Sequence, residues 1–153
     1  MIVKYMYAII IIVCLLASII TKNIEFILID VYIVITMITL VLVYSIHEYI
    51  HIYIIKKFEA NASLKITITW YSFSIHDVKV KFTQNINIFI ALMPNAVLLI
   101  FGLCLLQINK IIFENILIIN IISYICIISV INLLPIFGDG KTILKNIRRK
   151  KND

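Results

Sequence analysis

The sequence predicts an all-α membrane protein with about four transmembrane helices and a short β-hairpin between the second helix and the third. Of the 153 residues, 63% are hydrophobic, and the mean hydropathy of +1.08 lies far above that of soluble domains. Four apolar runs are long enough to consider as membrane spans, at about 5–20, 31–55, 88–108 and 115–137. We therefore expect one polytopic membrane domain over residues 1–153.

The run at 5–20 is the shortest of the four. It follows Lys4, as the apolar part of a signal peptide would, but no small-x-small cleavage site occurs before Lys22. We expect this run to remain in the protein as a transmembrane helix.

The basic residues predict the orientation in the membrane. With four spans, both termini and the segment between the second and third spans lie on one side. Only two of the 14 basic residues, Lys22 and Lys110, fall on the other side. By the positive-inside rule, we expect a multi-pass cell-membrane protein with cytoplasmic termini and a basic cytoplasmic tail at 141–153. The net charge of +6 therefore needs no nucleic-acid partner to explain it.

The segment at 64–82 differs in composition from the apolar runs. It is rich in Thr, Val, Ile and aromatic residues, and alternates between apolar and polar residues in KITIT and VKVKF. This pattern predicts a β-hairpin or short strands at the cytoplasmic membrane surface. The edge of such a strand could hold an extended polypeptide by strand addition.

A histidine-glutamate pair and a second histidine lie inside the second apolar run, as His47-Glu48-Tyr49-Ile50-His51. Each ionisable side chain at membrane depth costs about 3 kcal/mol on insertion scales, so three within five residues indicate ligation, pairing or reaction. On a helix, residues i and i+4 share one face, so both imidazoles can bind one zinc ion. The alternative is a chance match between satisfied histidines of a helix bundle.

A catalytic zinc site usually has three protein ligands, and the HExxH pattern supplies two. The candidates for the third are Asp139, Glu59, Asp77 and His76. Asp139 is favoured because it follows a helix break at Asn132 and Pro135, at the inner end of the fourth span. A solvated turn is the alternative for Asp139, since Gly-Asp-Gly is typical turn chemistry.

Glu48 is the candidate general base, because it lies beside the predicted zinc ligands and can move a proton to and from the reacting groups. Asn132 is a further polar residue of the fourth span, and it could equally cap or bridge helices. Pro94 and Asn95 interrupt the third run, where a simple kink is the expected effect.

These motifs together resemble the site-2 protease family of intramembrane zinc metalloproteases. The resemblance rests on HEYIH in one span, a strand-rich segment, the ALMPN sequence at 91–95 and INLLPIFGDGK at 131–141. It covers about 31–144 and is greatest with the stage IV sporulation protein FB branch of endospore-forming bacteria.

The resemblance implies a zinc ion held by His47, His51 and Asp139, with Glu48 activating water and Asn132 helping to position substrate. It implies cleavage of membrane-embedded or membrane-associated proteins near the cytoplasmic face, often with release of a transcription regulator. In the sporulation branch this regulator is a pro-sigma factor. The expected partners are therefore a membrane-tethered protein substrate and the lipid bilayer.

The chain also departs from the family pattern. Ile50 replaces the glycine of the usual HExGH, and three residues instead of four separate Pro135 from Asp139. The Gly-Pro-x-x-Asn pattern is kept only in part, as Met93-Pro94-Asn95.

Two functions of other classes stay open from the sequence. One is a non-catalytic scaffold or pseudoprotease that retains a zinc site, and the other is a metal or proton transport subunit that uses an intramembrane His and Glu relay. Glu48 favours the enzyme, because a purely structural zinc site does not need it. A homo-oligomer and a regulatory membrane partner are both compatible with the sequence.

Overall fold

The computed structural model describes residues 12–13, 15–17, 19–21, 24–69, 72–77, 82–136 and 138–150. The chain divides into two compact units, Met1–Leu40 and Val41–Asp153, which we treat separately. Most of the expected first span at 5–20 lies outside the described residues. All the predicted site residues belong to the second unit.

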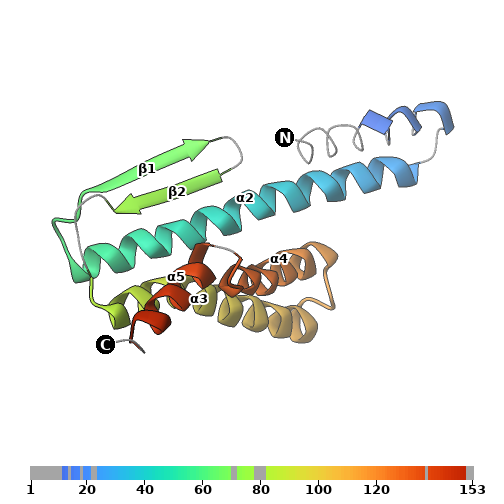
Figure 1. Cartoon of the computed structure of the whole chain (residues 1–153). Helices are drawn as coiled ribbons and strands as arrows, with labels where there is room; N and C mark the ends of the chain where they lie inside the picture. Colours follow the sequence, from blue (N-terminus) through green and yellow to red (C-terminus); the bar gives the residue numbers. More distant parts are fainter. Residues whose placement is uncertain are drawn as a thin grey trace. The chain divides into compact units, whose positions relative to one another are not determined.

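The long helix α2, Ile24–Phe58, carries the HEYIH sequence in its C-terminal half (Figure 1). Its 35 residues correspond to a length of about 52 Å, well above the ~30 Å hydrocarbon core of a bilayer. The helix therefore begins and ends beyond the expected span of 31–55. Lys56 and Lys57 occupy its last turn, where cations interact favourably with the helix dipole.

Between α2 and the next helix, the chain contains two antiparallel strands, β1 (Leu64–Thr69) and β2 (Ser72–Asp77). The backbone register pairs Leu64 with Asp77 and Thr69 with Ser72. The strands form a two-stranded sheet, so each strand has one edge that is unpaired within that sheet.

Helices α3 (Gln84–Ile112) and α4 (Leu117–Ile128) form an antiparallel hairpin (Figure 1). The two helices approach closely at Gly102, where an added Cβ would lie only 2.8 Å from the Ser123 carbonyl oxygen. The hairpin meets the second half of α2 in a small apolar core formed by Val43, Leu98 and Cys126. This packing places the HEYIH part of α2 beside the middle of α3.

The side chain of a buried asparagine makes hydrogen bonds that stabilise the turn between α3 and α4. Asn109 is fully buried, and its amide group donates to the Ile116 carbonyl at 2.9 Å and to Asn120 at 2.8 Å. Its side-chain oxygen accepts a hydrogen bond from the Ile116 N–H at 3.0 Å. The turn residues Glu114 and Asn115 have positive φ angles, and these hydrogen bonds hold the backbone there.

The fourth apolar run is not one regular helix through 115–137. Helix α4 ends at Ile128 and continues as a 3-10 helix, η1 (Ser129–Leu133), before the chain becomes extended at Leu134. The extended conformation follows from Pro135, whose ring disfavours the helical conformation of the preceding residue. A new helix, α5 (Gly138–Lys150), then begins. Asp139 consequently lies in the first turn of a helix, and part of the expected tail at 141–153 is helical.

Within the ranges that the structure describes, three helical stretches are long and apolar enough to cross a membrane: Ile24–Phe58, Gln84–Ile112, and the composite stretch Leu117–Arg148. Large apolar side chains on all three stretches are exposed, including Leu42, Ile100 and Tyr124. A lipid environment would cover such side chains, whereas water would not. The described part of the chain is thus that of a membrane protein.

Candidate metal centre

The two histidines of the HEYIH sequence lie side by side on α2. His47 is 3% exposed and His51 is 12% exposed. Their spacing of four residues places the rings on one face of the helix, and the two Nε2 atoms are 3.2 Å apart. Both histidines therefore present the same ring nitrogen to one point.

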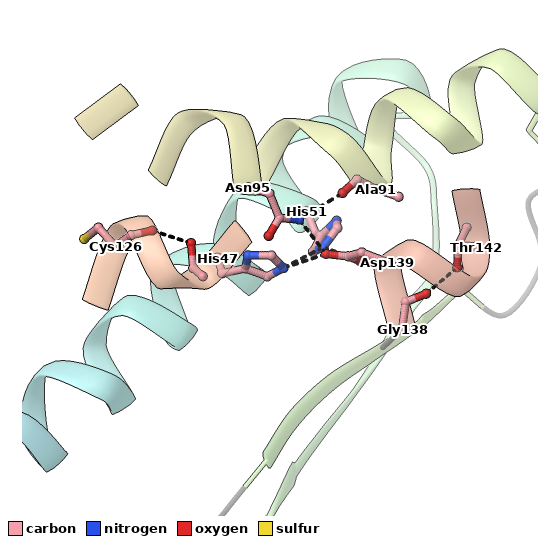
Figure 2. A network of polar contacts seen from close by, with 9 residues as sticks. His47, His51, Ala91, Asn95, Cys126, Gly138, Asp139 and Thr142 are labelled. Atoms are coloured by element: carbon pink, nitrogen blue, oxygen red, sulfur yellow. Dashed lines mark hydrogen bonds and ion pairs between the residues drawn. The ribbon is translucent and has the colours of Figure 1, made fainter. Parts of the chain in front are cut away.

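Asp139 reaches this point from α5 (Figure 2). Its Oδ2 lies 3.0 Å from Nε2 of His47, and its Oδ1 lies 3.2 Å from Nε2 of His51. Residues that are 92 positions apart in the sequence are thereby brought into direct contact. Among the candidates for a third ligand, Asp139 is the residue that joins the histidines.

The start of α5 fits tightly against the chain that precedes it. Gly140 is buried, and a Cβ at this position would collide with the carbonyl oxygens of Leu133 and Leu134. Gly138, at the beginning of the same helix, has open space around it instead. The absence of a side chain at Gly140 thus allows α5 to start where Asp139 faces the two histidines.

A fourth residue, Asn95 of α3, also contacts the aspartate. It is fully buried, and its Nδ2 donates to Oδ2 of Asp139 at 2.9 Å and to the Ala91 carbonyl at 3.2 Å. The local sequence at Pro94 and Asn95 predicts a simple kink, and it does not predict this contact. An asparagine inside an apolar span was the available signal, because a polar amide there needs partners. Only the fold shows that one partner is Asp139.

The arrangement of His47, His51 and Asp139 fits a metal ion. Each offers a ligand atom, and the three atoms lie within 4.8 Å of one another. Tetrahedral zinc with bonds of about 2.0–2.1 Å keeps its ligand atoms about 3.3 Å apart, close to the separations of 3.0 and 3.2 Å seen here. Two imidazoles and a carboxylate are a donor set that zinc accepts.

The ring of His47 turns one nitrogen toward the other two residues of the cluster. Its Nδ1 is buried and has no hydrogen-bond partner within the described ranges, so Nε2 is the ring atom that faces the other polar groups. The Tyr44 ring lies parallel to that of His47, with centroids 6.2 Å apart and an interplanar angle of 9°. The ring of His47 is thus oriented by its neighbours on α2.

Glu48, the predicted general base, is half-buried next to this cluster. It is not one of the three clustered ligand residues, and its carboxylate lies close to the Tyr44 hydroxyl. A carboxylate beside the ligands, but outside the ligand set, remains available to carry a proton.

The other predicted residues lie elsewhere. Asn132 is half-buried in η1, and the amide that contacts Asp139 comes from Asn95 instead. Glu59 is exposed just after the end of α2. His76 and Asp77 belong to β2, where their backbones pair with Lys65 and Leu64. The substrate-positioning role of Asn132 stays a prediction.

Comparison with known families supports a peptidase. The model of the DUF3267 family, described as "Putative zincin peptidase", matches residues 40–153, which include the whole candidate site. No curated protein and no solved structure gives a significant match to the chain.

Proposed function

Because the chain belongs to the DUF3267 family of zincin-like peptidases, we propose that it is a zinc metalloprotease that cuts proteins within or beside the membrane. The observation that carries this proposal is the convergence of His47, His51 and Asp139 from two separate helices. His47 and His51 would hold the ion through Nε2, and Asp139 through its carboxylate. A zinc ion supplies Lewis-acid chemistry: it polarises a peptide carbonyl and makes water a competent nucleophile near neutral pH.

Glu48 is assigned the proton transfers of the reaction. As the oxygen of water adds to the peptide carbonyl carbon, Glu48 accepts the proton that the water loses. When the C–N bond breaks, Glu48 returns this proton to the nitrogen of the leaving amine. The products are a carboxylic acid and an amine, and Glu48 ends in its starting state.

The surroundings of the site favour a membrane substrate. The HEYIH residues lie in an apolar helix, and their distances to Lys56 along the helix axis are roughly 13 and 8 Å for His47 and His51. The positive-inside rule predicts that Lys56 lies on the cytoplasmic side, and in that orientation the proposed site would lie near the inner face of the membrane. We propose a site-2 type of activity on membrane-embedded or membrane-associated proteins, with a membrane-tethered transcription regulator such as a pro-sigma factor as the substrate class.

Glu48→Gln tests the enzyme directly. The variant keeps the shape of the side chain but cannot take up a proton. It should therefore retain zinc, and its turnover rate should be about 10²- to 10⁴-fold lower than that of the wild type. The assay is co-expression with a candidate membrane-tethered pro-sigma substrate at equal protein levels, with zinc content measured on each purified protein. Glu59→Gln, at an exposed glutamate just after the end of the same helix, is the matched control and should cleave like the wild type.

Two results would contradict the proposal. Equal processing by the wild type and Glu48→Gln would mean that cleavage does not depend on this protein's own base. If the wild-type protein bound no zinc, the proposed zinc-dependent mechanism would be wrong. A non-catalytic scaffold or pseudoprotease would then be the better account.

A further inference from the structure

Asn95 is the one buried amide that reaches the ligand cluster in the described part of the chain (Figure 2). Its two hydrogen-bond partners are the Asp139 carboxylate and the Ala91 carbonyl, and both of them accept hydrogen bonds. The nitrogen of the amide must therefore face these partners, which fixes the orientation of the side chain.

The position of this hydrogen bond limits how Asp139 can turn. Oδ2 of the carboxylate contacts both Asn95 and His47, at 2.9 and 3.0 Å, while Oδ1 contacts His51 at 3.2 Å. Rotation of the carboxylate would break the bond to Asn95. The amide thus holds one oxygen toward each histidine.

The hydrogen bond from Asn95 to Asp139 also connects a third helix, α3, to the two helices that carry the ligand residues. Both histidines belong to α2 and Asp139 belongs to α5, whereas Asn95 belongs to α3. Asp139 lies one residue after the start of α5, close to the turn at Pro135. The hydrogen bond from α3 therefore restrains the aspartate independently of the histidines.

Asn95 carries an energetic cost that its helix does not explain. Its Oδ1 is buried without a hydrogen-bond partner among the described residues, and an unpaired buried acceptor destabilises the folded state. An apolar residue of the same shape would avoid this cost in α3. The interaction that compensates for this cost is the charge-assisted hydrogen bond from Asn95 to Asp139.

We propose that Asn95 is a positioning residue of the metal centre, which holds the Asp139 carboxylate in the orientation that binds the ion. This inference rests on the proposed zinc site and adds to it a residue outside the HExxH and DG motifs. Loss of such a supporting hydrogen bond typically lowers metal affinity 10- to 100-fold.

The experiment compares zinc affinities of the full chain in detergent by competition with a chelator. The variants are Asn95→Leu, which keeps the approximate size, and Asn95→Ser, which is small enough to avoid any clash. Asn146→Leu is the matched control, because Asn146 is a buried asparagine of α5 whose amide donates, among the described residues, to the Thr142 carbonyl one turn away. The absorption bands of the cobalt-substituted proteins report the ligand geometry, and the unfolding midpoint reports stability.

We expect both Asn95 variants to bind zinc 10- to 100-fold more weakly than the wild type, with altered cobalt bands, while Asn146→Leu binds like the wild type. A double-mutant cycle tests whether Asn95 acts through Asp139. In the Asp139→Ala background, adding Asn95→Leu should not lower the zinc affinity further.

Zinc affinities within twofold of the wild type in both Asn95 variants would overturn the inference. So would losses of affinity that only follow the unfolding midpoint, or that persist unchanged in the Asp139→Ala background. A wild-type protein that binds no zinc would instead contradict the proposed function itself, so the two failures are distinguishable.

Discussion

At the scale of single residues, the candidate site depends on the match between helix periodicity and ligand spacing. The four-residue interval between His47 and His51 brings their Nε2 atoms to 3.2 Å. Asp139 adds a negative charge within 3.2 Å of both imidazoles, in a setting where each group is largely removed from solvent. A buried carboxylate is costly unless it is paired or bound to a cation, and a metal ion held between Asp139 and the two histidines would meet this need.

The charge of Asp139 should therefore determine how tightly zinc is bound. Asp139→Asn keeps the size of the side chain but removes the full charge, and we expect zinc affinity to fall more than about tenfold, or about 1.4 kcal/mol. Isothermal titration or chelator competition measures this change, with Glu59→Gln as the charge-matched control. An unchanged affinity in Asp139→Asn would exclude the carboxylate as a ligand.

At the scale of elements, the junction between η1 and α5 decides where Asp139 lies. The chain leaves the 3-10 helix at Leu133, passes Pro135, and starts α5 against its own carbonyl groups at Gly140. The spacing of three residues between Pro135 and Asp139 is compatible with the site, because the new helix begins at Gly138 and its first turn presents the aspartate.

The two glycines of this junction should behave differently. In Gly140→Ala the added methyl group collides with the Leu133 and Leu134 carbonyls, so α5 must shift, and we expect at least a tenfold loss of zinc affinity. Gly138→Ala meets nothing within 4 Å and should bind zinc within twofold of the wild type. Zinc titration of both variants checks this pair, and equal affinities would show that the close approach at Gly140 does not position Asp139.

The α3–α4 hairpin should depend on the Asn109 side chain. Replacement by Leu leaves the N–H and C=O groups of Ile116 without their partner, which should lower the free energy of unfolding by about 2–4 kcal/mol. Denaturant or thermal unfolding in detergent measures the loss.

The control for this prediction is Asn87→Leu, which removes a single side-chain hydrogen bond, to the Phe82 carbonyl. We expect it to cost no more than about 1.5 kcal/mol. If Asn109→Leu were as stable as this control, the hydrogen bonds of Asn109 would not be what holds the hairpin turn.

At the scale of the whole molecule, the helices expose large apolar side chains, while the fully buried amides of Asn95 and Asn109 make their hydrogen bonds inside the protein. This distribution is typical of a protein whose exterior faces lipid. The basic residues then predict which side of the membrane each connection faces.

Single cysteines should report this orientation. In a variant without the native cysteines, we expect cytoplasmic accessibility at position 61, between α2 and β1, and accessibility from the opposite side at position 114, between α3 and α4. Labelling of intact cells and of inverted vesicles with a membrane-impermeant maleimide separates the two. Labelling of both positions from one side would contradict the proposed orientation.

The membrane character of the chain and the membership of the His47, His51 and Asp139 cluster were predictable from the sequence. Run length and hydropathy suffice to predict the membrane character, because a bilayer requires long apolar segments whatever their packing. His47 and His51 are predictable because they form a local pattern on one helix, and the HExxH spacing is recognised without any tertiary contact. Asp139 was selected from four candidates by its place after a helix break.

Other features were decided by the tertiary structure. The helix break itself was expected, but the start of α5 at Gly138 depends on the close approach of Gly140 to the Leu133 and Leu134 carbonyls. Likewise, nothing in the local sequence around Asn95 indicates that its amide meets a carboxylate 44 residues away. Local patterns specify which groups a helix presents, whereas the partner that each group meets is set by how the helices pack.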